Sequence, residues 1–388
     1  MCGGEGGGEI LHRVAVGVFE AVAGRRGDVA NGGVIAGGDG GAERERCAVH
    51  SDRGWGLVVD AGADLVAAVA DAASMNGAWF YAGSDAQAAA GAMYEDQIDV
   101  WVGRQYGPYK ITGVLGRGTV AHCYRATTLR GDEVGLKVLT PFAEARAEIR
   151  SLFEQEYELM ARLDHPNVLA VLGAGVIGGA HFMEMEIVEG ETLADRCGSR
   201  HPPTLAESIA VVQQMCAALD HVHEHRIVHR DVKPSNIMLD AQPDSSDRAV
   251  LFDFGLAHDV DGPPSPPGRV YGSPMYLSPE QALAQPVDAR TDIYGLGSTL
   301  YVLAVGSAPF YGERNDLLHA HVRTPPPDPA ERGVSAELSE IILTAMAKSP
   351  DDRFSSGADL AAALAAVEIP AQDSERRRGL LRRLTSRA

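Results

Sequence analysis

The amino-acid sequence predicts an α+β protein of two lobes: a small β-rich lobe that holds one long helix, then a larger, mostly helical lobe. Three observations support this fold class. Residues 109–139 alternate strand-like apolar segments with turn residues, a helical pattern follows from about Ala143 to Leu163, and after Gly190 the apolar spacing is helical almost throughout. Strands grouped before helices, rather than alternating with them, are typical of an α+β fold.

The small lobe is expected to begin with three strands joined by turns. Their sequences are YKITGVLGRG, HCYRATTL and EVGLKVL, and Gly116, Gly118 and an Arg-Gly-Asp run at 130–132 supply the turn signals. The helix that follows should end at the His-Pro-Asn run at 165–167, because proline cannot continue it. Two further apolar runs, VLAVLGAGVI and HFMEMEIV, complete this lobe.

The larger lobe is expected to contain four long helices separated by proline-rich breaks. Their sequences are LAESIAVVQQMCAALDHVHEH, TDIYGLGSTLYVLAVG, SAELSEIILTAMAK and GADLAAALAAV. The breaks PPSPPG and TPPPDP lack backbone N–H donors at their prolines and so separate the helices. We expect the two lobes to form one domain over residues 105–369, with the small lobe at about 105–187 and the larger lobe at about 188–369.

Two segments flank this domain and differ from it in composition. Residues 1–104 contain glycine clusters such as GGEGGG, which lose much conformational entropy on ordering, so we expect a disordered or wrongly assigned N-terminal extension. A regulatory domain, or a translation start at Met93, is the alternative there. Residues 370–388 form a basic tail, which is either a solvated chain or a short amphipathic helix in weak contact with an anionic surface.

The overall composition limits the function classes. A net charge of −19 opposes contact with nucleic-acid phosphates, so we expect no nucleic-acid partner. No apolar run reaches the roughly 18 residues that a membrane span needs, and the N-terminus lacks the basic and apolar regions of a secretory signal. The 5 cysteines are scattered and odd in number, which fits a reducing compartment. We therefore expect a cytoplasmic protein without a transmembrane segment.

The first motif with chemical meaning lies in the β-rich lobe. Gly116 and Gly118 occupy a strand–turn–strand hairpin, where a backbone without side chains is able to close over the phosphates of a nucleotide. Lys137 lies inside an apolar strand, where its charge needs a partner. Glu156 on the following helix is the expected partner.

The second and third motifs lie in the helical lobe. In HRDVKPSN, the spacing allows Asp231 and Asn236 to face one pocket, as general base and metal ligand, and Lys233 between them is suited to steady a phosphoryl group. The run Asp-Phe-Gly at 253–255 follows an apolar strand-like segment, and an aspartate there makes a good Mg²⁺ ligand. The segment GSPMYLSPE follows at 272–280.

In this order and at these spacings, the motifs resemble the eukaryotic-like (Hanks-type) protein kinases, most closely their bacterial serine/threonine branch. The segments YLSPEQA, HVRTPPPDP and AKSPDDRFSSGADLAAAL carry the resemblance to that branch, which spans about residues 105–369. The resemblance implies a bilobal protein-kinase-like fold. It also implies a non-specific serine/threonine protein kinase of signal transduction, which transfers the γ-phosphate of ATP to Ser or Thr hydroxyls of protein substrates with the help of Mg²⁺.

The resemblance further implies roles for single residues. Asp231 would be the catalytic base and Lys233 would steady the γ-phosphate, while Lys137, held by Glu156, would contact the α- and β-phosphates. A larger set would bind the nucleotide, with Met185 as gatekeeper beside the hinge. Asn236 and Asp253, two members of this set, would also hold Mg²⁺. The nucleotide set is Leu115, Gly116, Arg117, Gly118, Cys123, Lys137, Met185, Glu186, Val188, Asn236 and Asp253.

Other contacts implied by the family brace this site. Glu280 would pair with Arg353 inside the helical lobe, and Asp292 would anchor the catalytic loop from a central helix. Four residues would stack as an apolar spine between the lobes: Val171, Met160, Phe254 and His229.

Some positions depart from the pattern of the family. Ala121 replaces the third glycine of the phosphate loop, and Cys123 and Gly135 replace a valine and an alanine over the adenine. We expect a slightly loose adenine roof, with the Cys123 thiol either open to alkylation or inert.

The activation segment is the largest departure. No threonine lies between Asp253 and Glu280, although Arg230 has the place of an arginine that in the family pairs with a phosphorylated residue. Ser265 is the first candidate acceptor and Tyr271 the second. The alternative is that the flanking prolines order the segment without phosphate.

Two other function classes are the competing interpretations. A pseudokinase scaffold would be expected to lack one of the motif residues, and all of them are present. A small-molecule kinase of related fold would lack the segment 272–280, which forms a platform for a peptide. The sequence therefore favours an active protein kinase.

Overall fold

The computed structural model describes residues 101–368, apart from 242–246, 264–265 and 267, together with the backbone of three short strands nearer the N-terminus. Those strands, β1 (Glu45–His50), β2 (Gly56–Ala61) and β3 (Trp79–Ala82), form an antiparallel sheet in the order β2-β1-β3. Met93, most of the expected extension and all of the basic tail 370–388 lie outside the described residues.

The small lobe is a six-stranded antiparallel sheet in the order β4-β5-β6-β7-β9-β8. Its strands are β4 (Gln105–Tyr106), β5 (Tyr109–Arg117), β6 (Ala121–Thr127), β7 (Glu133–Leu139), β8 (Val171–Ile177) and β9 (Ala180–Met185). The three strands predicted at the start of the lobe are β5, β6 and β7. Cys123 is paired in register with Gly116 on one side and with Lys137 on the other, so three predicted nucleotide-binding residues lie in one line across the sheet.

The single long helix predicted from about Ala143 to Leu163 is two helices, and that part of the prediction is wrong. The first, α4 (Pro141–Glu144), begins early because Pro141 stands at its first turn and Thr140 caps it. Arg146 then adopts an extended backbone, and α5 (Ala147–Met160) starts after it. Only α5 is the long helix of the lobe, and it carries Glu156 on its buried side.

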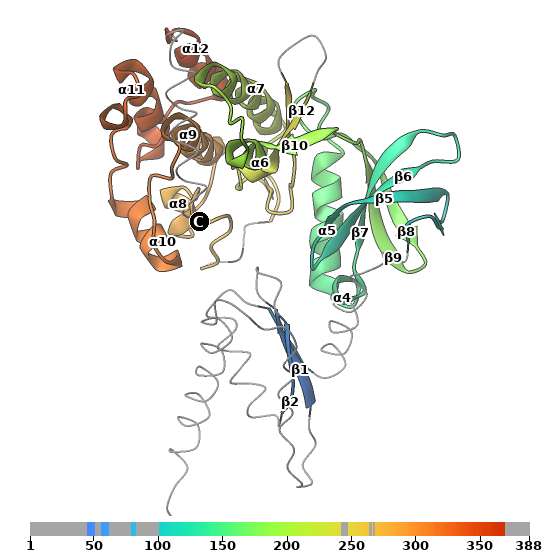
Figure 1. Cartoon of the computed structure of the whole chain (residues 1–388). Coiled ribbons are helices and arrows are strands. Elements are labelled where there is room, and N and C mark those ends of the chain that lie inside the picture. Colours follow the sequence, from blue (N-terminus) through green and yellow to red (C-terminus); the bar gives the residue numbers. More distant parts are fainter. Residues whose placement is uncertain are drawn as a thin grey trace, which may run out of the picture.

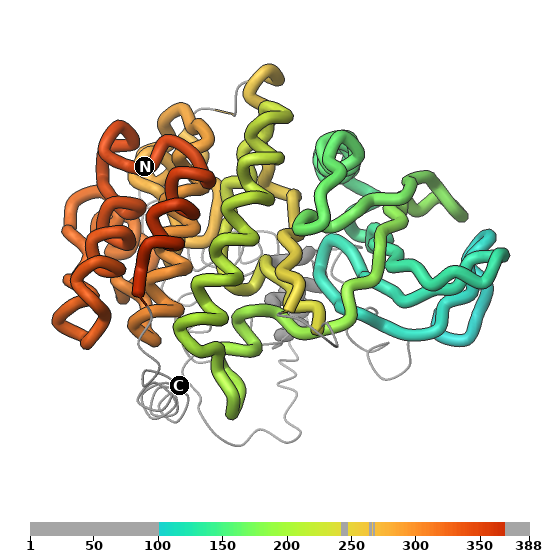
Figure 2. Tube along the Cα trace, turned by 90° about the horizontal axis from the view of Figure 1, so that it is seen from above, coloured from blue at the N-terminus to red at the C-terminus, as the bar shows by residue number. Residues whose placement is uncertain are grey.

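The larger lobe is mostly helical, as predicted, and lies to the left of the small sheet in Figure 1. The four predicted helices are α7 (Leu205–Glu224), α9 (Ala289–Val305), α11 (Ala336–Ala345) and α12 (Gly357–Ala365). Further helices, not predicted, are α6 (Leu193–Gly198), α8 (Pro279–Ala282) and α10 (Arg314–Arg323), with 3-10 turns η2 (Pro234–Asn236), η3 (Pro329–Arg332) and η4 (Pro350–Asp352). Viewed from above, the orange and red helices lie on one side and the cyan sheet on the other (Figure 2).

Short strands carry the loops of the site on top of this helical lobe. Strand β12 (Ile237–Asp240) pairs with β10 (Gly190–Thr192) and β13 (Arg248–Leu251), and β11 (Ile227–Val228) pairs with β14 (His258–Asp259). The loop 229–236 therefore lies between β11 and β12, and residues 252–257 lie between β13 and β14.

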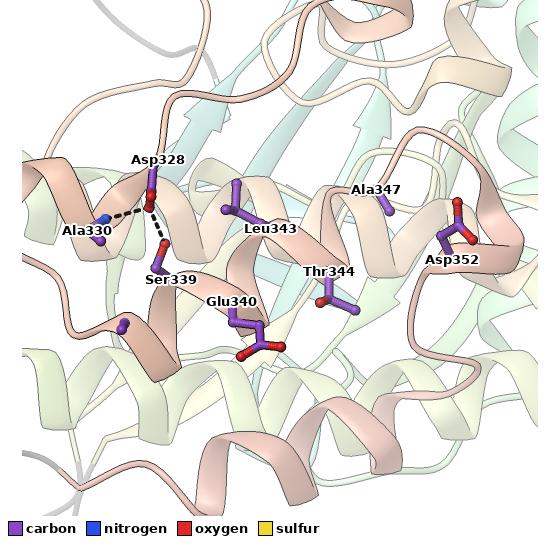
Figure 3. Close-up of a pocket in the computed structure, with 9 residues that line it drawn as sticks. Asp328, Ala330, Ser339, Glu340, Leu343, Thr344, Ala347 and Asp352 are labelled. Atoms are coloured by element: carbon purple, nitrogen blue, oxygen red, sulfur yellow. Dashed lines mark hydrogen bonds between the residues drawn. The ribbon is translucent and has the colours of Figure 1, made fainter.

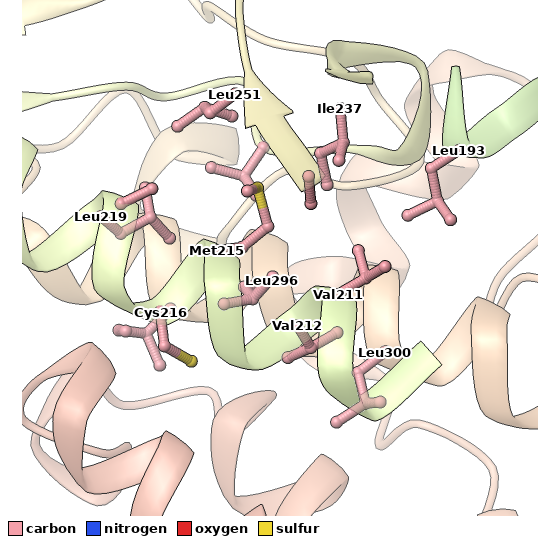
Figure 4. Packing of buried hydrophobic residues seen from close by; sticks show 14 of the residues in the cluster. Leu193, Val211, Val212, Met215, Cys216, Leu219, Ile237, Leu251, Leu296 and Leu300 are labelled. Carbon is pink, nitrogen blue, oxygen red and sulfur yellow. The ribbon is translucent and has the colours of Figure 1, made fainter. Parts of the chain in front are cut away.

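The main hydrophobic core lies beneath these strands. Met215 and Leu219 of α7, Leu296 of α9 and Ile237 and Leu251 of the short sheet are all buried in one cluster (Figure 4). Burial of each such side chain contributes about 1.5–3 kcal/mol to folding. This packing gives the loops between the strands a rigid base.

Within the described part of the chain, no helix combines the length and the apolar character that a membrane crossing requires.

Candidate active site

The loop 229–236 is held from below by Asp292 on α9. One carboxylate oxygen of Asp292 accepts from the backbone N–H of His229 at 2.8 Å, and the other accepts from the N–H of Arg230 at 2.8 Å. His223 on α7 contacts the same carboxylate at 2.8 Å. Asp292 is 1% exposed, so these contacts form in a medium of low polarity, where they are strong. The predicted anchoring of the loop by Asp292 is confirmed.

The carboxylate of Asp231 lies at the centre of a hydrogen-bond network. Its Oδ2 accepts from Lys233 Nζ at 2.6 Å and from Asn236 Nδ2 at 3.1 Å, and its Oδ1 accepts from the Ser273 N–H at 2.9 Å. Lys233 Nζ also donates to Ser273 Oγ at 2.6 Å. Burial opposes ionisation of Asp231, but these donors and the Lys233 charge outweigh it and lower the pKa below its usual value. Asp231 is therefore ionised at neutral pH.

Lys137 and Glu156 meet between the sheet and α5, as predicted. Burial disfavours the charge on Lys137, but the carboxylates of Glu156 and Asp253, together with the hydrogen bonds to Glu156, outweigh it and raise the pKa of the ammonium. Lys137 is therefore a fixed positive charge facing the Asp253 side of the site.

Asn236 and Asp253 both offer oxygen atoms of the kind that Mg²⁺ binds. The Asn236 amide nitrogen donates to the Asp231 backbone carbonyl at 2.9 Å as well as to its carboxylate, which leaves the amide oxygen for another partner. Among the described residues, the exposed Asp253 carboxylate makes no hydrogen bond. Mg²⁺ takes oxygen ligands and is usually held by one or two protein groups plus substrate phosphates. Accordingly, no group of three or more metal-binding side chains occurs in the described residues.

The glycine hairpin leaves open space over the site. A Cβ added to Gly116 would meet no protein atom within 4 Å, and its backbone has no positive φ that would demand glycine. Protein packing therefore does not explain the glycine. Gly118 donates its N–H to the Ala121 carbonyl at 3.0 Å, which closes the turn. Leu115 and Arg117, also predicted to bind nucleotide, are exposed in the same strand.

Gly135 was expected to loosen the predicted adenine roof, but it does not simply enlarge that space. A Cβ at Gly135 would lie 3.1 Å from Met185 Cγ, which is tighter than ordinary contact, so the gatekeeper side chain occupies part of the space that an alanine would fill. Burial raises the pKa of the Cys123 thiol. Met185 therefore fills part of the space that the prediction left open at Gly135, while the loose roof expected at Cys123 stays a prediction.

The hinge presents backbone groups without partners. The Glu186 N–H donates to the Ala170 carbonyl at 3.0 Å, and its carboxylate is held by the Ala170 N–H and by Arg248. Both backbone groups of Val188 lack a hydrogen bond within the part of the chain that the structure describes. They are available to a planar ligand with donor and acceptor edges, as predicted for adenine.

The predicted pairing of Glu280 with Arg353 is confirmed, and so is one contact of the predicted spine. Arg353 donates from two nitrogens to the two carboxylate oxygens of Glu280, each at 2.8 Å, with the Arg353 side chain 0% exposed. The His229 and Phe254 rings meet edge to face at 4.7 Å between centroids. Met160 and Phe254 are buried in the main core, and Val171 packs against it.

Arg230 is engaged by backbone carbonyls and by an aromatic ring. Its Nε donates to the Leu256 carbonyl at 2.6 Å, a second nitrogen donates to the Ala257 carbonyl at 3.4 Å, and its guanidinium lies 4.9 Å from the centre of the Tyr271 ring. Ser265, the first candidate acceptor, lies outside the described residues.

One contact of the site was missed by the sequence reasoning. The side chain of Gln281 touches the backbone on both sides of the Asp231 network, at Arg230 and Tyr271. A sequence signal existed, because Ser278 and Gln281 have the spacing of a helix capping box, and that motif is present at the start of α8.

A separate cavity of about 470 Å³ lies against α11 in the helical lobe. It is lined by small and acidic residues and contains none of the predicted site residues (Figure 3). Its Asp328 carboxylate is already bound to the Ala330 N–H at 2.8 Å and to Ser339 Oγ at 2.6 Å. The candidate site therefore remains the one around Asp231.

Comparison with known proteins places this arrangement in context. The model of the protein kinase domain family matches residues 109–366. The chain is 35% identical over 268 residues to serine/threonine-protein kinase PknD of Mycobacterium tuberculosis (strain CDC 1551 / Oshkosh), which covers 68% of this chain and 40% of that protein. It is 35% identical over 270 residues to serine/threonine-protein kinase PknB of Mycobacterium tuberculosis (strain ATCC 25618 / H37Rv), with 67% and 42% covered. The chain thus spans about two fifths of the length of these curated relatives.

Solved structures agree with the fold. The crystal structure of the Mycobacterium tuberculosis PknI kinase domain is 30% identical, has a TM-score of 0.54, and covers 69% of this chain and 99% of that one. A double mutant of the same domain, C20A_R136A, gives a TM-score of 0.55 at 29% identity, with 69% and 98% covered. The predicted bilobal fold is confirmed.

Proposed function

This chain belongs to the protein kinase family, and from that premise we propose that it is an active serine/threonine protein kinase that transfers the γ-phosphate of ATP to protein hydroxyls. The observation that carries the proposal is the joint placement of Asp231, Lys233 and Ser273. An ionised carboxylate and an ammonium lie 2.6 Å apart beside a segment suited to hold a peptide.

The proposed reaction needs positioning more than covalent help. The substrate hydroxyl oxygen forms a bond to the γ-phosphorus as the bond from that phosphorus to the β–γ bridging oxygen breaks, and ADP leaves. Asp231 accepts the hydroxyl proton, which then passes to solvent. Lys233 and Lys137 place positive charge where the transferring and remaining phosphates would lie.

The nucleotide and the metal belong to the same proposal. We assign ATP to the space under Gly116 and Gly118, with its base at the Val188 backbone and the Met185 gatekeeper. Asn236 and Asp253 would hold Mg²⁺, which when bound neutralises phosphate charge. All residues of the predicted nucleotide set keep their assigned roles within the proposal.

The choice of a protein substrate rests on the segment 272–280. Ser273 in this segment contacts both Asp231 and Lys233, so the platform for a peptide and the catalytic loop are joined. A small-molecule kinase has no use for such a platform. We further propose a cytoplasmic location, supported by the scattered cysteines, and a weak contact of the basic tail with an anionic surface.

A direct test separates a serine/threonine protein kinase from a tyrosine kinase and from a small-molecule kinase. The purified chain is incubated with γ-labelled ATP, Mg²⁺ and a generic protein substrate, and the labelled protein is hydrolysed to its amino acids. Phosphoserine and phosphothreonine are expected. Label only in phosphotyrosine or only in a small molecule would contradict the proposal.

A further inference from the structure

Gln281 has every hydrogen-bonding group of its side-chain amide occupied. Its Nε2 donates to the Arg230 carbonyl at 2.8 Å and to the Tyr271 carbonyl at 3.0 Å, and its Oε1 accepts from the Ser278 N–H at 3.0 Å. The residue is 6% exposed. A primary amide has two N–H donors, and both are used here. Loss of either would remove a hydrogen bond from a part-buried backbone carbonyl, which is costly.

The first of these bonds fixes the peptide group that precedes Asp231. The carbonyl of that peptide, from Arg230, accepts from Gln281, and its N–H, from Asp231, donates to His229 Nδ1 at 3.2 Å. Arg230 has φ +65°, a region that non-glycine residues rarely adopt and keep only where the surroundings hold them. Gln281 therefore helps to set the direction in which the Asp231 side chain leaves the backbone.

The second bond fixes the segment on the opposite side of the carboxylate. Tyr271 lies two residues before Ser273, whose N–H and hydroxyl contact Asp231 and Lys233. Between them, Gly272 has φ +114°, and a Cβ there would lie 2.9 Å from the Arg230 carbonyl and 3.1 Å from Gln281 Nε2. The two loops thus approach so closely that only glycine fits, and the Gln281 amide nitrogen bonds to both of them, in addition to the contacts of Ser273.

We propose that Gln281 is a positioning residue for phosphoryl transfer, which acts by fixing the Arg230–Asp231 peptide and the Tyr271–Ser273 segment relative to each other. This proposal rests on the proposed kinase function. The hydrogen bonds of the Gln281 side chain go to Arg230, Tyr271 and Ser278, none of which belongs to the proposed nucleotide set. Removal of this side chain should therefore lower turnover and leave nucleotide affinity unchanged.

Three variants test the proposal. Gln281→Met keeps the length of the side chain but removes the donors. Gln281→Glu keeps the shape, yet its carboxylate faces two carbonyl oxygens, and burial there raises its pKa. Only its protonated form is able to donate. Gln285→Glu, at an exposed position just beyond the same short helix, is the matched control.

We expect kcat to fall about tenfold or more in both Gln281 variants at pH 7.5, with the Kd for ATP within about twofold of wild type. Lowering the pH towards 6 should partly restore kcat in Gln281→Glu alone, because the Asp231 pKa is low and the base stays ionised in that range. The control should behave as wild type. Unchanged kcat in both variants, equal loss of ATP affinity and kcat, or absence of the pH rescue would overturn the proposal.

Hydrogen exchange gives a readout that does not depend on catalysis. The Asp231 and Ser273 amides should exchange faster in Gln281→Met than in wild type, and at the wild-type rate in Gln285→Glu. Equal exchange in all three proteins would refute the positioning role. If the wild type had no kinase activity, the proposed function would fail, and the exchange rates would still decide whether Gln281 joins the loops.

Discussion

The ammonium of Lys137 lies 2.7 Å from each of the two carboxylate oxygens of Glu156, so that one symmetric ion pair joins strand β7 to helix α5. Glu156 is 6% exposed and the Lys137 side chain 22%. The pair is shielded from water on the glutamate side and open on the lysine side, which suits a lysine that must also reach a phosphate.

Replacement of Glu156 by Gln should reduce kcat/KM for ATP about a hundredfold, because Lys137 would lose the charge that holds its ammonium in place; a hundredfold corresponds to about 2.7 kcal/mol. Burial would then act on Lys137 with less opposition, and its pKa should fall. Steady-state kinetics at varied ATP measure the effect. Glu158→Gln, at an exposed position on the same helix, is the control and should match wild type. Equal kinetics for both variants would be inconsistent with the role assigned to the pair.

Asp253→Asn should increase the Mg²⁺ concentration needed for half-maximal activity by about tenfold or more, because a neutral amide is a weaker ligand than a carboxylate for a hard cation. A titration of activity with Mg²⁺ at fixed ATP measures this. The Tm of the nucleotide-free protein should not fall, because Asp253 makes no hydrogen bond among the described residues. A Mg²⁺ requirement equal to that of wild type would remove Asp253 from the proposed site.

Glu280→Gln should lower the free energy of unfolding by about 3–5 kcal/mol, because it leaves the buried Arg353 without its counter-charge. Burial raises the pKa of Glu280, but Arg353 outweighs this and holds it below 4.5, its ordinary value. The contribution is therefore present above pH 4.5 and is lost as the pH falls through the lower folded pKa. Urea unfolding at pH 7 and pH 4 measures the difference. Asp351→Asn, which breaks the exposed pair with Arg290, should cost less than about 1 kcal/mol; a similar loss in both variants would argue against the bracing role.

Arg230 is engaged by backbone carbonyls and by the Tyr271 ring, so Ser265→Ala should leave kinase activity within about twofold of wild type. Tyr271→Leu removes the ring and should lower activity several-fold, because a cation–π contact of this kind contributes about 0.5–2 kcal/mol. Assays on both variants, with mass spectrometry of residue 265, decide between this account and a phosphorylated switch. A phosphate at Ser265 in active protein, together with an inactive alanine variant, would favour the switch.

Much of the fold was predictable because local signals agree with tertiary structure. The alternation of apolar residues with Gly-containing turns placed β5, β6 and β7 to within about two residues, which is the usual uncertainty of such boundaries. The helix break at Arg146 was not predictable. The 3.6-residue apolar period continues across it, and the break depends on how Thr140 and Pro141 start α4 against the sheet.

The residues of the candidate site also divide into those that the sequence predicts and those that only the structure reveals. Asp231, Lys233, Asn236 and Asp253 stand in short motifs whose spacing is readable in the sequence. Gln281 was missed because its importance comes from two carbonyls, at Arg230 and Tyr271, that are 51 and 10 residues away in sequence. The contact of Met185 with Gly135 was missed for a similar reason, since it depends on the packing of β7 against β9.

The most direct test of the account is phosphoryl transfer by the wild type beside Asp231→Asn. The asparagine keeps the shape of the residue and removes the base, so nucleotide binding should persist. In single-turnover experiments with γ-labelled ATP, Mg²⁺ and a generic protein substrate, the variant should label the substrate at least about a hundredfold more slowly, which corresponds to about 2.7 kcal/mol in the barrier. ATP affinity should stay within about twofold. Equal labelling by the two proteins, or no labelling by either, would contradict the assignment of this chain as a kinase that uses Asp231.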